Sequence, residues 1–255
     1  MTFECLTRRA ALRMAAGAVV GSMALPRRGS GQSKSDREHR IDLDVPILSD
    51  EPASVPIRVG LDHPMEADHH IQSIEVSIER DPVPAKGTFV FTPANGRAWV
   101  AYQMRSGTGG LVKVVAVCSR HGELLASRGV RVVEGGCSTP PERNARDRVG
   151  HPELRLPSSV KLGEPFEVRA RVSHGSHTGL VLKQGKFVRE LPEYYVKSMT
   201  VWLDDQQVSQ FQMTSAVSPN PLIRFPLKVA RPARLRVQFV NSEEQRWEVL
   251  QAIGG

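Results

Sequence analysis

The stretch IQSIEVSIE, residues 71–79, alternates apolar and polar side chains along its length. On an extended chain Ile74, Val76 and Ile78 therefore point one way and the residues between them the other. That period of two predicts a β-strand with one buried face. Further short segments of this kind lie on either side of it, separated by turn residues: 55–64, 88–92, 98–104, 111–118 and 124–133. About seven strands at such spacing predict a sandwich of the immunoglobulin type.

The second half of the chain repeats this plan. Three of its segments correspond in pattern to segments of the first half: 166–175 to 55–64, 196–204 to 71–79, and 233–240 to 111–118. Between the halves, residues 138–159 are rich in Pro, Arg and Asn and have almost no apolar period, which predicts a linker. We therefore expect an all-β fold of two tandem immunoglobulin-like β-sandwich domains, at 41–137 and 160–255.

The composition fits a globular protein with many turns. Of the 255 residues 40% are hydrophobic, and 18 prolines and 21 glycines favour short strands. The formal net charge is +7, but five of the arginines lie in or near the first 30 residues. The remaining charge is scattered, without a basic helix or an aromatic-studded basic stripe. We therefore expect no nucleic-acid partner.

Residues 1–31 have the features of an export signal. Arg8 and Arg9 precede a modestly apolar run of small residues, 10–25, which Arg13 interrupts. The interruption leaves the run too short for a membrane span, and its low hydrophobicity favours the twin-arginine route. We expect a twin-arginine-type signal peptide that is removed on export. The mature protein is then periplasmic and has no membrane span.

The first half ends in a cysteine that is placed between glycines and prolines. Residues 130–133 predict a strand, and Gly135 and Gly136 end it because they accept backbone angles closed to other residues and offer no side chain to pack. Residues 140–141 are both proline and cannot donate ladder hydrogen bonds, so the strand does not resume. We therefore expect Cys137 to lie on an arm and not within a sheet.

A thiol on such an arm can enter another protein's active site, and its thiolate can take up a covalent cargo. Exposed free cysteines are otherwise avoided, which favours a function for Cys137 over a simple strand end at the surface. Cys118 ends the apolar run 111–118 and is expected to be a small buried hydrophobe. A disulfide between the two cysteines is open in an oxidising compartment, but it would tie down the arm.

Four further candidate ligands, His63, Met65, His69 and His70, lie close together in the sequence. Imidazole suits Cu(II) and thioether suits Cu(I), so this segment is a candidate copper site. The alternative is a polar loop between two strands. A second cluster elsewhere would be needed to complete a metal shell, and we therefore expect no metal and no cofactor.

Catalysis by the chain itself is not expected. Residues 174–178 place two histidines beside a serine, but the chain has no Gly-x-Ser-x-Gly elbow and no strand-to-helix context for one. We therefore expect a protein that is not an enzyme and has no catalytic residues.

The two halves resemble a pair of known families. The first half resembles SoxY, above all in the Gly-Gly-Cys that ends residues 130–137. The second half resembles SoxZ, above all in the Pro-Asn-Pro of residues 217–225. Further segments that carry the resemblance are 74–79 and 89–93 in the first half, and 166–179 and 194–203 in the second. Together they resemble a single-chain SoxYZ carrier over nearly the whole mature sequence.

The resemblance implies two packed immunoglobulin-like sandwiches in the periplasm. It also implies that Cys137 carries sulfur intermediates covalently during thiosulfate oxidation, with Gly135 and Gly136 as the hinge of the arm. The implied partners are periplasmic sulfur-oxidation enzymes and c-type cytochromes. One departure is clear: SoxY typically stops at Gly-Gly-Cys-Gly-Gly, whereas here residues 138–139 are Ser-Thr and the chain continues. Losing the distal glycines stiffens the arm, and the fusion anchors it at both ends.

Two alternative functions remain open. Fused carriers of this kind are also associated with periplasmic quinoprotein alcohol dehydrogenases, so the chain could be an accessory or docking module in which Cys137 is secondary. The other alternative is a copper-binding sandwich that uses the histidines of residues 63–70. Replacement of Cys137 separates the carrier from the docking module, and metal analysis tests the copper site.

Overall fold

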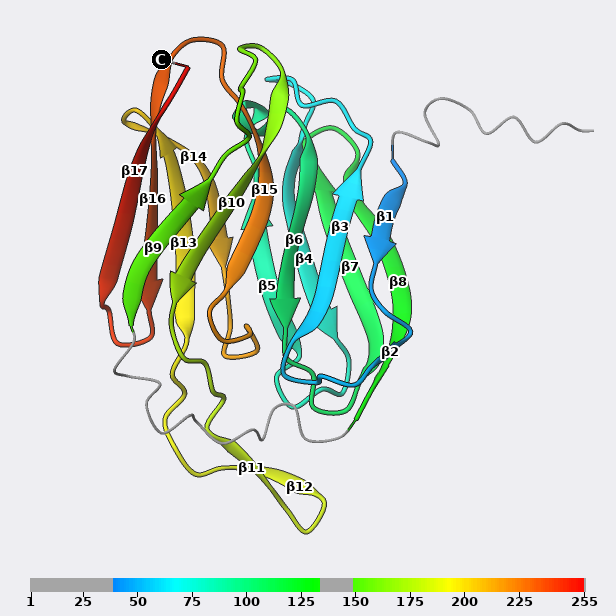
Figure 1. The fold of residues 1–255 in the computed structure, drawn as a ribbon. Helices are drawn as coiled ribbons and strands as arrows, with labels where there is room; N and C mark the ends of the chain where they lie inside the picture. Colours follow the sequence, from blue (N-terminus) through cyan, green and yellow to red (C-terminus); the bar gives the residue numbers. More distant parts are fainter. Residues whose placement is uncertain (1–38, 134–148, 255) are drawn as a thin grey trace, which may run out of the picture. The chain divides into compact units, whose positions relative to one another are not determined.

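The computed structural model describes residues 39–133 and 149–254 (Figure 1). These residues form two β-sheets that pack face to face, together with a short hairpin and one turn of 3-10 helix. The all-β prediction is confirmed. Cys137, Gly135 and Gly136 lie outside the described residues, as does the signal peptide predicted at 1–31.

The smaller sheet has six strands and contains members from both halves of the chain. All its neighbours pair antiparallel. In spatial order the strands are β1 (Ile41–Asp44), β3 (Val55–Leu61), β6 (Ala98–Met104), β15 (Leu222–Lys228), β10 (Pro165–Ser173) and β9 (Gly150–Arg155).

The larger sheet has nine strands and also crosses from one half to the other. Only β2 and β8 pair in parallel within it among the described strands. In spatial order the strands are β17 (Arg246–Ile253), β16 (Ala233–Asn241), β13 (Val196–Leu203), β14 (Gln206–Gln212), β5 (Ala85–Val90), β4 (Ile71–Ile78), β7 (Gly110–Cys118), β8 (Gly122–Val132) and β2 (Leu48–Ser49). Outside the two sheets are the hairpin β11 (Leu180–Lys183) and β12 (Lys186–Arg189), and the 3-10 helix η1 (Pro93–Asn95).

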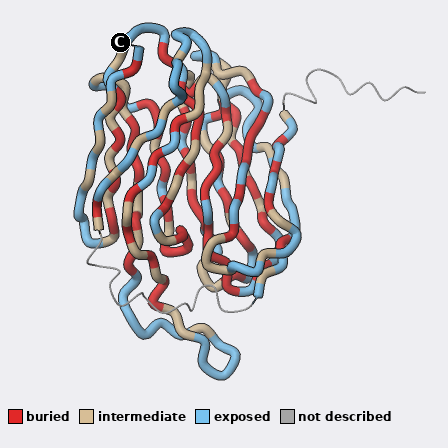
Figure 2. Tube along the Cα trace, viewed as in Figure 1, coloured by how far each residue is buried: buried red, intermediate tan, exposed pale blue. Residues whose placement is uncertain are grey.

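The two halves join edge to edge in both sheets. Phe89 of β5 pairs with Phe211 of β14, and Ala101 of β6 pairs with Arg224 of β15. The ring of Phe89 also contacts those of Phe211 and Phe225, at centroid distances of 5.6 and 5.8 Å. One hydrophobic core therefore runs through both halves, and buried residues line the inside of the strands along its length (Figure 2).

Strand β4 shows how the sequence pattern becomes burial. Ile71, Ile74, Val76 and Ile78 are all buried, as the alternation predicts for the last three. Ile71 breaks the period of two, because the register of β4 with β7 shifts by one residue between Ile71 and Ser73. Such a bulge rotates the side chains that precede it onto the other face.

Strand β9 corrects the predicted linker at 138–159, because its six residues lie inside that range. Pro152 is compatible with a strand here because β9 is at the edge of its sheet, where one side needs no ladder hydrogen bonds. Gly150 begins the strand at φ 106°, and a Cβ there would lie 2.9 Å from the indole nitrogen of Trp247. The weak apolar period arises because only one face of β9, with Pro152 and Leu154, is partly covered.

Buried polar side chains hold the first half to the second. The Asn95 amide is fully buried and donates to the Ser209 hydroxyl at 2.8 Å and to the Pro226 carbonyl at 2.9 Å. The Pro-Asn-Pro segment reaches the same junction, since the Ser218 hydroxyl donates to the Ala53 carbonyl at 2.8 Å. These bonds satisfy groups that burial would otherwise leave unpaired.

The first half also contains a buried ion pair. The Lys86 ammonium lies 2.7 Å from the Asp81 carboxylate, and neither side chain is exposed. Asp81 also accepts hydrogen bonds from the Ser106 hydroxyl and the Gly107 amide, both at 2.8 Å. Burial alone would raise the pKa of Asp81, but the Lys86 charge and these hydrogen bonds outweigh it and hold the pKa below its ordinary value.

Candidate functional site

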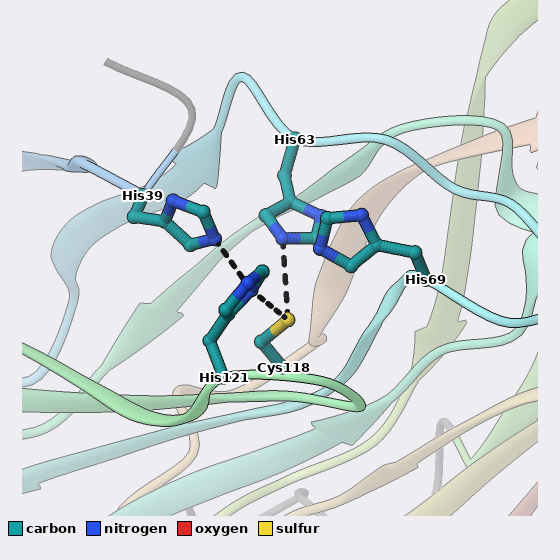
Figure 3. Close-up of side chains that lie close together, drawn as sticks. All are labelled: His39, His63, His69, Cys118 and His121. Carbon is teal, nitrogen blue, oxygen red and sulfur yellow. Dashed lines mark hydrogen bonds between the residues drawn. The ribbon is translucent and has the colours of Figure 1, made fainter. Parts of the chain in front are cut away.

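Five side chains converge at one end of the first half: His39, His63, His69, Cys118 and His121 (Figure 3). Each offers one ligand atom, and all five atoms lie within 4.8 Å of one another. The group is called the His4Cys cluster below. It contains four imidazoles and one thiol, and no carboxylate belongs to it.

Strand pairing brings these residues together from distant parts of the sequence. In the smaller sheet Ile41 pairs with Leu61, so the start of β1 lies beside the end of β3. His39 and His63 stand just outside those two ends. In the larger sheet Ile71 pairs with Cys118, so the start of β4 lies beside the end of β7. His69 precedes β4, and His121 lies in the turn between β7 and β8. The cluster thus bridges the two sheets.

The short contacts in the cluster are two between nitrogen and sulfur and one between two nitrogens. The Cys118 sulfur lies 3.4 Å from His63 Nε2 and 3.4 Å from His121 Nδ1. His39 Nε2 lies 2.8 Å from His121 Nδ1. The ring of His69 completes the group, with its centroid 4.6 Å from that of His63 and 5.0 Å from that of His121.

The backbone orients one of the imidazoles. His63 Nδ1 lies 2.7 Å from the Pro64 carbonyl, which can only accept, so Nδ1 carries the proton and donates it. His63 Nε2 therefore turns its lone pair toward Cys118. A hydrogen bond of this kind fixes the tautomer of a metal-binding histidine.

His69 contributes a buried ring nitrogen to the cluster. Its Nε2 atom is buried and finds no hydrogen-bond partner among the described residues. A buried polar atom left unpaired costs about 1–3 kcal/mol, so such an atom calls for an explanation.

The cluster runs from the core to the surface. Cys118 is 2% exposed and His63 is 8% exposed, whereas His121 is exposed. Loss of water contact lowers the pKa of His63, and the neighbouring imidazoles lower it further, although the Pro64 carbonyl acts in the opposite direction. Loss of water contact also lowers the pKa of His121, followed by the charges of His39, His69 and Arg120. Both imidazoles therefore favour the neutral form, which has a lone pair to donate.

The copper candidates His63, Met65, His69 and His70 do not stay together. His63 and His69 point into the cluster. Met65 packs against the hydrophobic core, and His70 Nδ1 lies 3.0 Å from the Glu66 carbonyl. The sequence interpretation missed His39, Cys118 and His121. The available signal was Cys118-x-x-His121 at the end of a strand, which was interpreted only as a buried hydrophobe before a turn; that Cys118 is buried is confirmed.

His174, one of the two histidines of residues 174–178, serves the packing of the second half. His174 stacks on Tyr194 with ring centroids 4.4 Å apart, and its Nε2 accepts a hydrogen bond from the Asn241 amide at 3.1 Å. The Ser176 hydroxyl donates to the Val217 carbonyl at 2.6 Å. These contacts are those of a packed strand end.

Solved structures resemble parts of this fold. A superoxide reductase (neelaredoxin) from Ignicoccus hospitalis is 25% identical over 42% of this chain and 92% of its own, with a TM-score of 0.36. A hypothetical protein from Pyrococcus horikoshii is 11% identical over 43% of this chain and 90% of its own, with a TM-score of 0.29. A glycosyl hydrolase family 2 member from Bacteroides cellulosilyticus is 8% identical over 78% of this chain and 24% of its own, with a TM-score of 0.25. At TM-scores below 0.5 these likenesses carry no argument about the present chain.

Family models match both halves of the sequence. The model of sulfur oxidation protein SoxY matches residues 28–137, and that of sulphur oxidation protein SoxZ matches residues 154–251. No curated protein matches the sequence. In the part of the chain that the structure describes, no helix has the length and apolarity that a bilayer crossing needs. The two matches stand in tandem and cover most of the chain, so this protein is a fused SoxYZ-like protein of sulfur oxidation, with a SoxY-family first half and a SoxZ-family second half.

Proposed function

We propose that this protein is a periplasmic carrier that holds sulfur-compound intermediates covalently on Cys137 and presents them to enzymes of sulfur oxidation. The observation that carries the proposal is that the SoxY match ends on Cys137 itself, five residues beyond the end of β8. The chain supplies the attachment point, and the chemistry on the cargo belongs to partner enzymes.

The attachment step forms a sulfur–sulfur bond. When thiosulfate is the cargo, the Cys137 sulfur bonds to its outer sulfur, the thiol proton goes to solvent and two electrons leave. A c-type cytochrome partner is the acceptor of those electrons. The thiolate is the reactive form of the cysteine. The product is a cysteine S-thiosulfonate, which a partner enzyme can then hydrolyse or oxidise.

The length of β8 supports a Cys137 thiol that is free of Cys118. Cys118 pairs with Gly122 at the start of β8, and Val132 ends the strand. Those ten residue steps span about 33 Å in a strand. The five further steps to Cys137 reach at most about 18 Å. A disulfide needs Cα atoms within about 7 Å of each other, so these two cysteines cannot pair while β8 stays in its sheet.

The second half supports the proposal because it forms a rigid extension of the sandwich that holds β8. It continues both sheets of the first half through β14 and β15, and buried hydrogen bonds of Asn95 cross the junction. A continuous sandwich holds the end of β8 in a fixed place relative to the surface of the second half. We propose that this surface offers part of the docking site for the partner enzymes.

Intact mass of the mature protein from its native periplasm tests the proposal. We expect adducts in steps of one sulfur atom or of a sulfonate, lost on treatment with reductant. Cys137→Ala should abolish them, whereas the adjacent Ser138→Ala, the matched control, should retain them. A chain that always has its bare mass contradicts the carrier proposal, and the docking module for a quinoprotein alcohol dehydrogenase then becomes the better account.

A further inference from the structure

We propose that His39, His63, His69, Cys118 and His121 bind one first-row transition-metal ion through four imidazole nitrogens and one thiolate. This site goes beyond the carrier function, which uses neither these histidines nor Cys118. It stands on the convergence of five ligand atoms from three separate segments and on the buried His69 nitrogen, which has no hydrogen-bond partner among the described residues.

The spacing of the ligand atoms fits a single ion. Bonds of about 2.1 Å to nitrogen and 2.3 Å to sulfur place neighbouring ligand atoms about 3.0–3.4 Å apart and opposite ones about 4.2–4.4 Å apart. In the cluster the short contacts measure 2.8 and 3.4 Å, and no pair of ligand atoms is separated by more than 4.8 Å. The cluster thus has the dimensions of a coordination shell.

Protons alone do not satisfy the cluster. His63 donates through Nδ1 to the Pro64 carbonyl, so its Nε2 can only accept, and the Cys118 thiol has one proton to give it. His121 Nδ1 can then donate toward His39 or toward the sulfur. This arrangement still leaves the buried Nε2 of His69 without a partner among the described residues. One metal ion accepts a lone pair from all five residues and removes that cost.

The ligand types select the class of ion. Magnesium and calcium take oxygen ligands, and the cluster has none. Imidazole and thiolate together suit iron, copper and zinc. Zinc takes four ligands in almost all structural sites, and thiolate copper sites use two imidazoles. Five ligands therefore favour an ion that accepts five or six, and iron(II) is the occupant we expect.

The position of the cluster gives the ion one side toward solvent. Cys118 and His63 are buried and hold it from the core, whereas His121 is exposed; Figure 3 shows the five side chains around the shared centre. The site stands at the start of β8, whereas Cys137 follows the end of that strand. Because β8 spans about 33 Å and the five residue steps beyond it reach at most about 18 Å, the Cys137 thiol cannot reach the ion while β8 stays in its sheet.

Cobalt(II) titration of the chelator-treated mature protein tests the site. Cobalt(II) gives an absorption band from thiolate-to-metal charge transfer and ligand-field bands that report coordination number. We expect one cobalt per chain, a thiolate band and ligand-field bands of a five- or six-coordinate ion. The same titration in a Cys137→Ala background assigns the thiolate band, because Cys118 is then the sole thiol beyond the predicted signal peptide.

Ligand variants decide which residues bind. Loss of a residue that only orients a ligand weakens metal binding by about 10- to 100-fold, so His121→Gln and His69→Gln should each weaken it by about 100-fold or more. His70→Gln is the matched control, since this neighbouring imidazole is turned to the Glu66 carbonyl and should bind cobalt like the natural chain. Cys118→Ser should abolish the thiolate band. Because Cys118 is buried, the exposed His121 provides the variant least prone to misfolding.

Three outcomes would overturn the proposal: no cobalt bound, equal affinity in His121→Gln and His70→Gln, or tetrahedral bands that persist when one of the four histidines is replaced. Iron analysis of protein purified from its native periplasm completes the test. About one iron per chain, lost in His121→Gln, supports the site. No sulfur compound enters these measurements, so their result is independent of the carrier function.

Discussion

The two halves end their corresponding strands alike but close those ends with different side chains. In the first half His63 follows β3, and Cys118 at the end of β7 pairs with the start of β4. In the second half His174 follows β10, and Asn241 at the end of β16 pairs with the start of β13. In each half the residue at the strand end faces the imidazole. The sulfur lies 3.4 Å from His63 Nε2, and the Asn241 amide nitrogen lies 3.1 Å from His174 Nε2.

In the second half, hydrogen bonds between protein groups satisfy the polar side chains at this end of the strands. The Asn241 amide nitrogen also donates to Gln245 Oε1 at 2.9 Å, and its oxygen accepts from the backbone amides of Glu243 and Gln245 at 3.0 and 2.9 Å. His174 Nδ1 donates to the Gly175 carbonyl. The amide and the imidazole thus satisfy each other and the turn around them.

In the first half, imidazole nitrogens and a sulfur atom with lone pairs stand where the second half has the Asn241 amide. A thiol and four imidazoles meet where the second half has one amide and one imidazole, and a buried nitrogen of His69 stays unpaired among the described residues. Similar backbone geometry therefore supports a closed packing contact in one half and an arrangement suited to a metal in the other. The identity of a few side chains at the strand ends makes the difference.

The buried Asp81–Lys86 ion pair is a polar site that protein groups satisfy without a metal ion, so its loss gives a reference value for the free energy of unfolding. Lys86→Met should lower the free energy of unfolding by about 3–5 kcal/mol, because it leaves the Asp81 carboxylate buried and uncompensated. Urea unfolding measures the loss, which should be the same with and without chelator. Lys113→Met is the matched control, since its ion pair with Glu79 is exposed and contributes little to stability. Equal effects of the two variants would contradict the prediction.

Asn241→Ala should destabilise the closed end of the second half. It removes four hydrogen-bond contacts and leaves buried groups unpaired, so we expect a loss of about 3 kcal/mol in the free energy of unfolding. Chelator should not change the loss, and cobalt affinity should equal that of the natural chain. An exposed glutamine on β14, changed as Gln206→Ala, should cost less than about 0.5 kcal/mol. A weakened cobalt affinity in Asn241→Ala would contradict the prediction that only the strand ends of the first half bind metal.

Metal should stabilise the first half in the way that the amide stabilises the second. At a free metal concentration of about 100 times Kd, binding contributes about 2.7 kcal/mol. For a folded unit of this size that raises Tm by about 5–10 °C. Differential scanning fluorimetry with cobalt and then with chelator checks the shift. Asn241→Ala should keep the shift and His121→Gln should lose it, whereas a shift of the same size in both would remove the His4Cys cluster as its cause.

Many of the strands were predictable from the sequence, but their association was not. The alternation of residues 71–79 and 233–240 predicts strands that the structure contains as β4 and β16. The continuous sheets depend on β5 pairing with β14 and β6 with β15, across more than a hundred residues of sequence. Nothing in the alternation of one strand identifies which strand lies beside it. Strand β9 was missed because its edge position leaves only a faint apolar period.

The two candidate sites show opposite kinds of signal. Cys137 is marked by its neighbours in the sequence, the two glycines and the prolines, and it falls outside the described residues. The His4Cys cluster has no single motif, because its ligands come from three segments that only the fold brings together. His63 and His69 were both among the four predicted copper ligands, but the residues that complete the cluster come from the segment before β1, from the end of β7 and from the β7–β8 turn. A sequence spacing rule cannot express that arrangement.

The imidazole of the closed end should make stability depend on pH. Burial lowers the pKa of His174, outweighing the Gly175 carbonyl and the Glu243 carboxylate, which favour the charged form. Since the folded pKa lies below the unfolded value of about 6.5, the contribution to stability is complete above that pH and is lost as the pH falls through the folded pKa.

Unfolding between pH 7.5 and 5, in the presence of chelator so that no metal contributes, measures this dependence. His174→Gln should lose less stability over the range than the natural chain, by about 1.4 kcal/mol for each unit by which the pKa is lowered. The matched control is His151→Gln, which changes an exposed histidine of β9 in the same way. If His174→Gln and the natural chain lose stability equally, the neutral imidazole is not what closes this end, and the amide of Asn241 must do so without it.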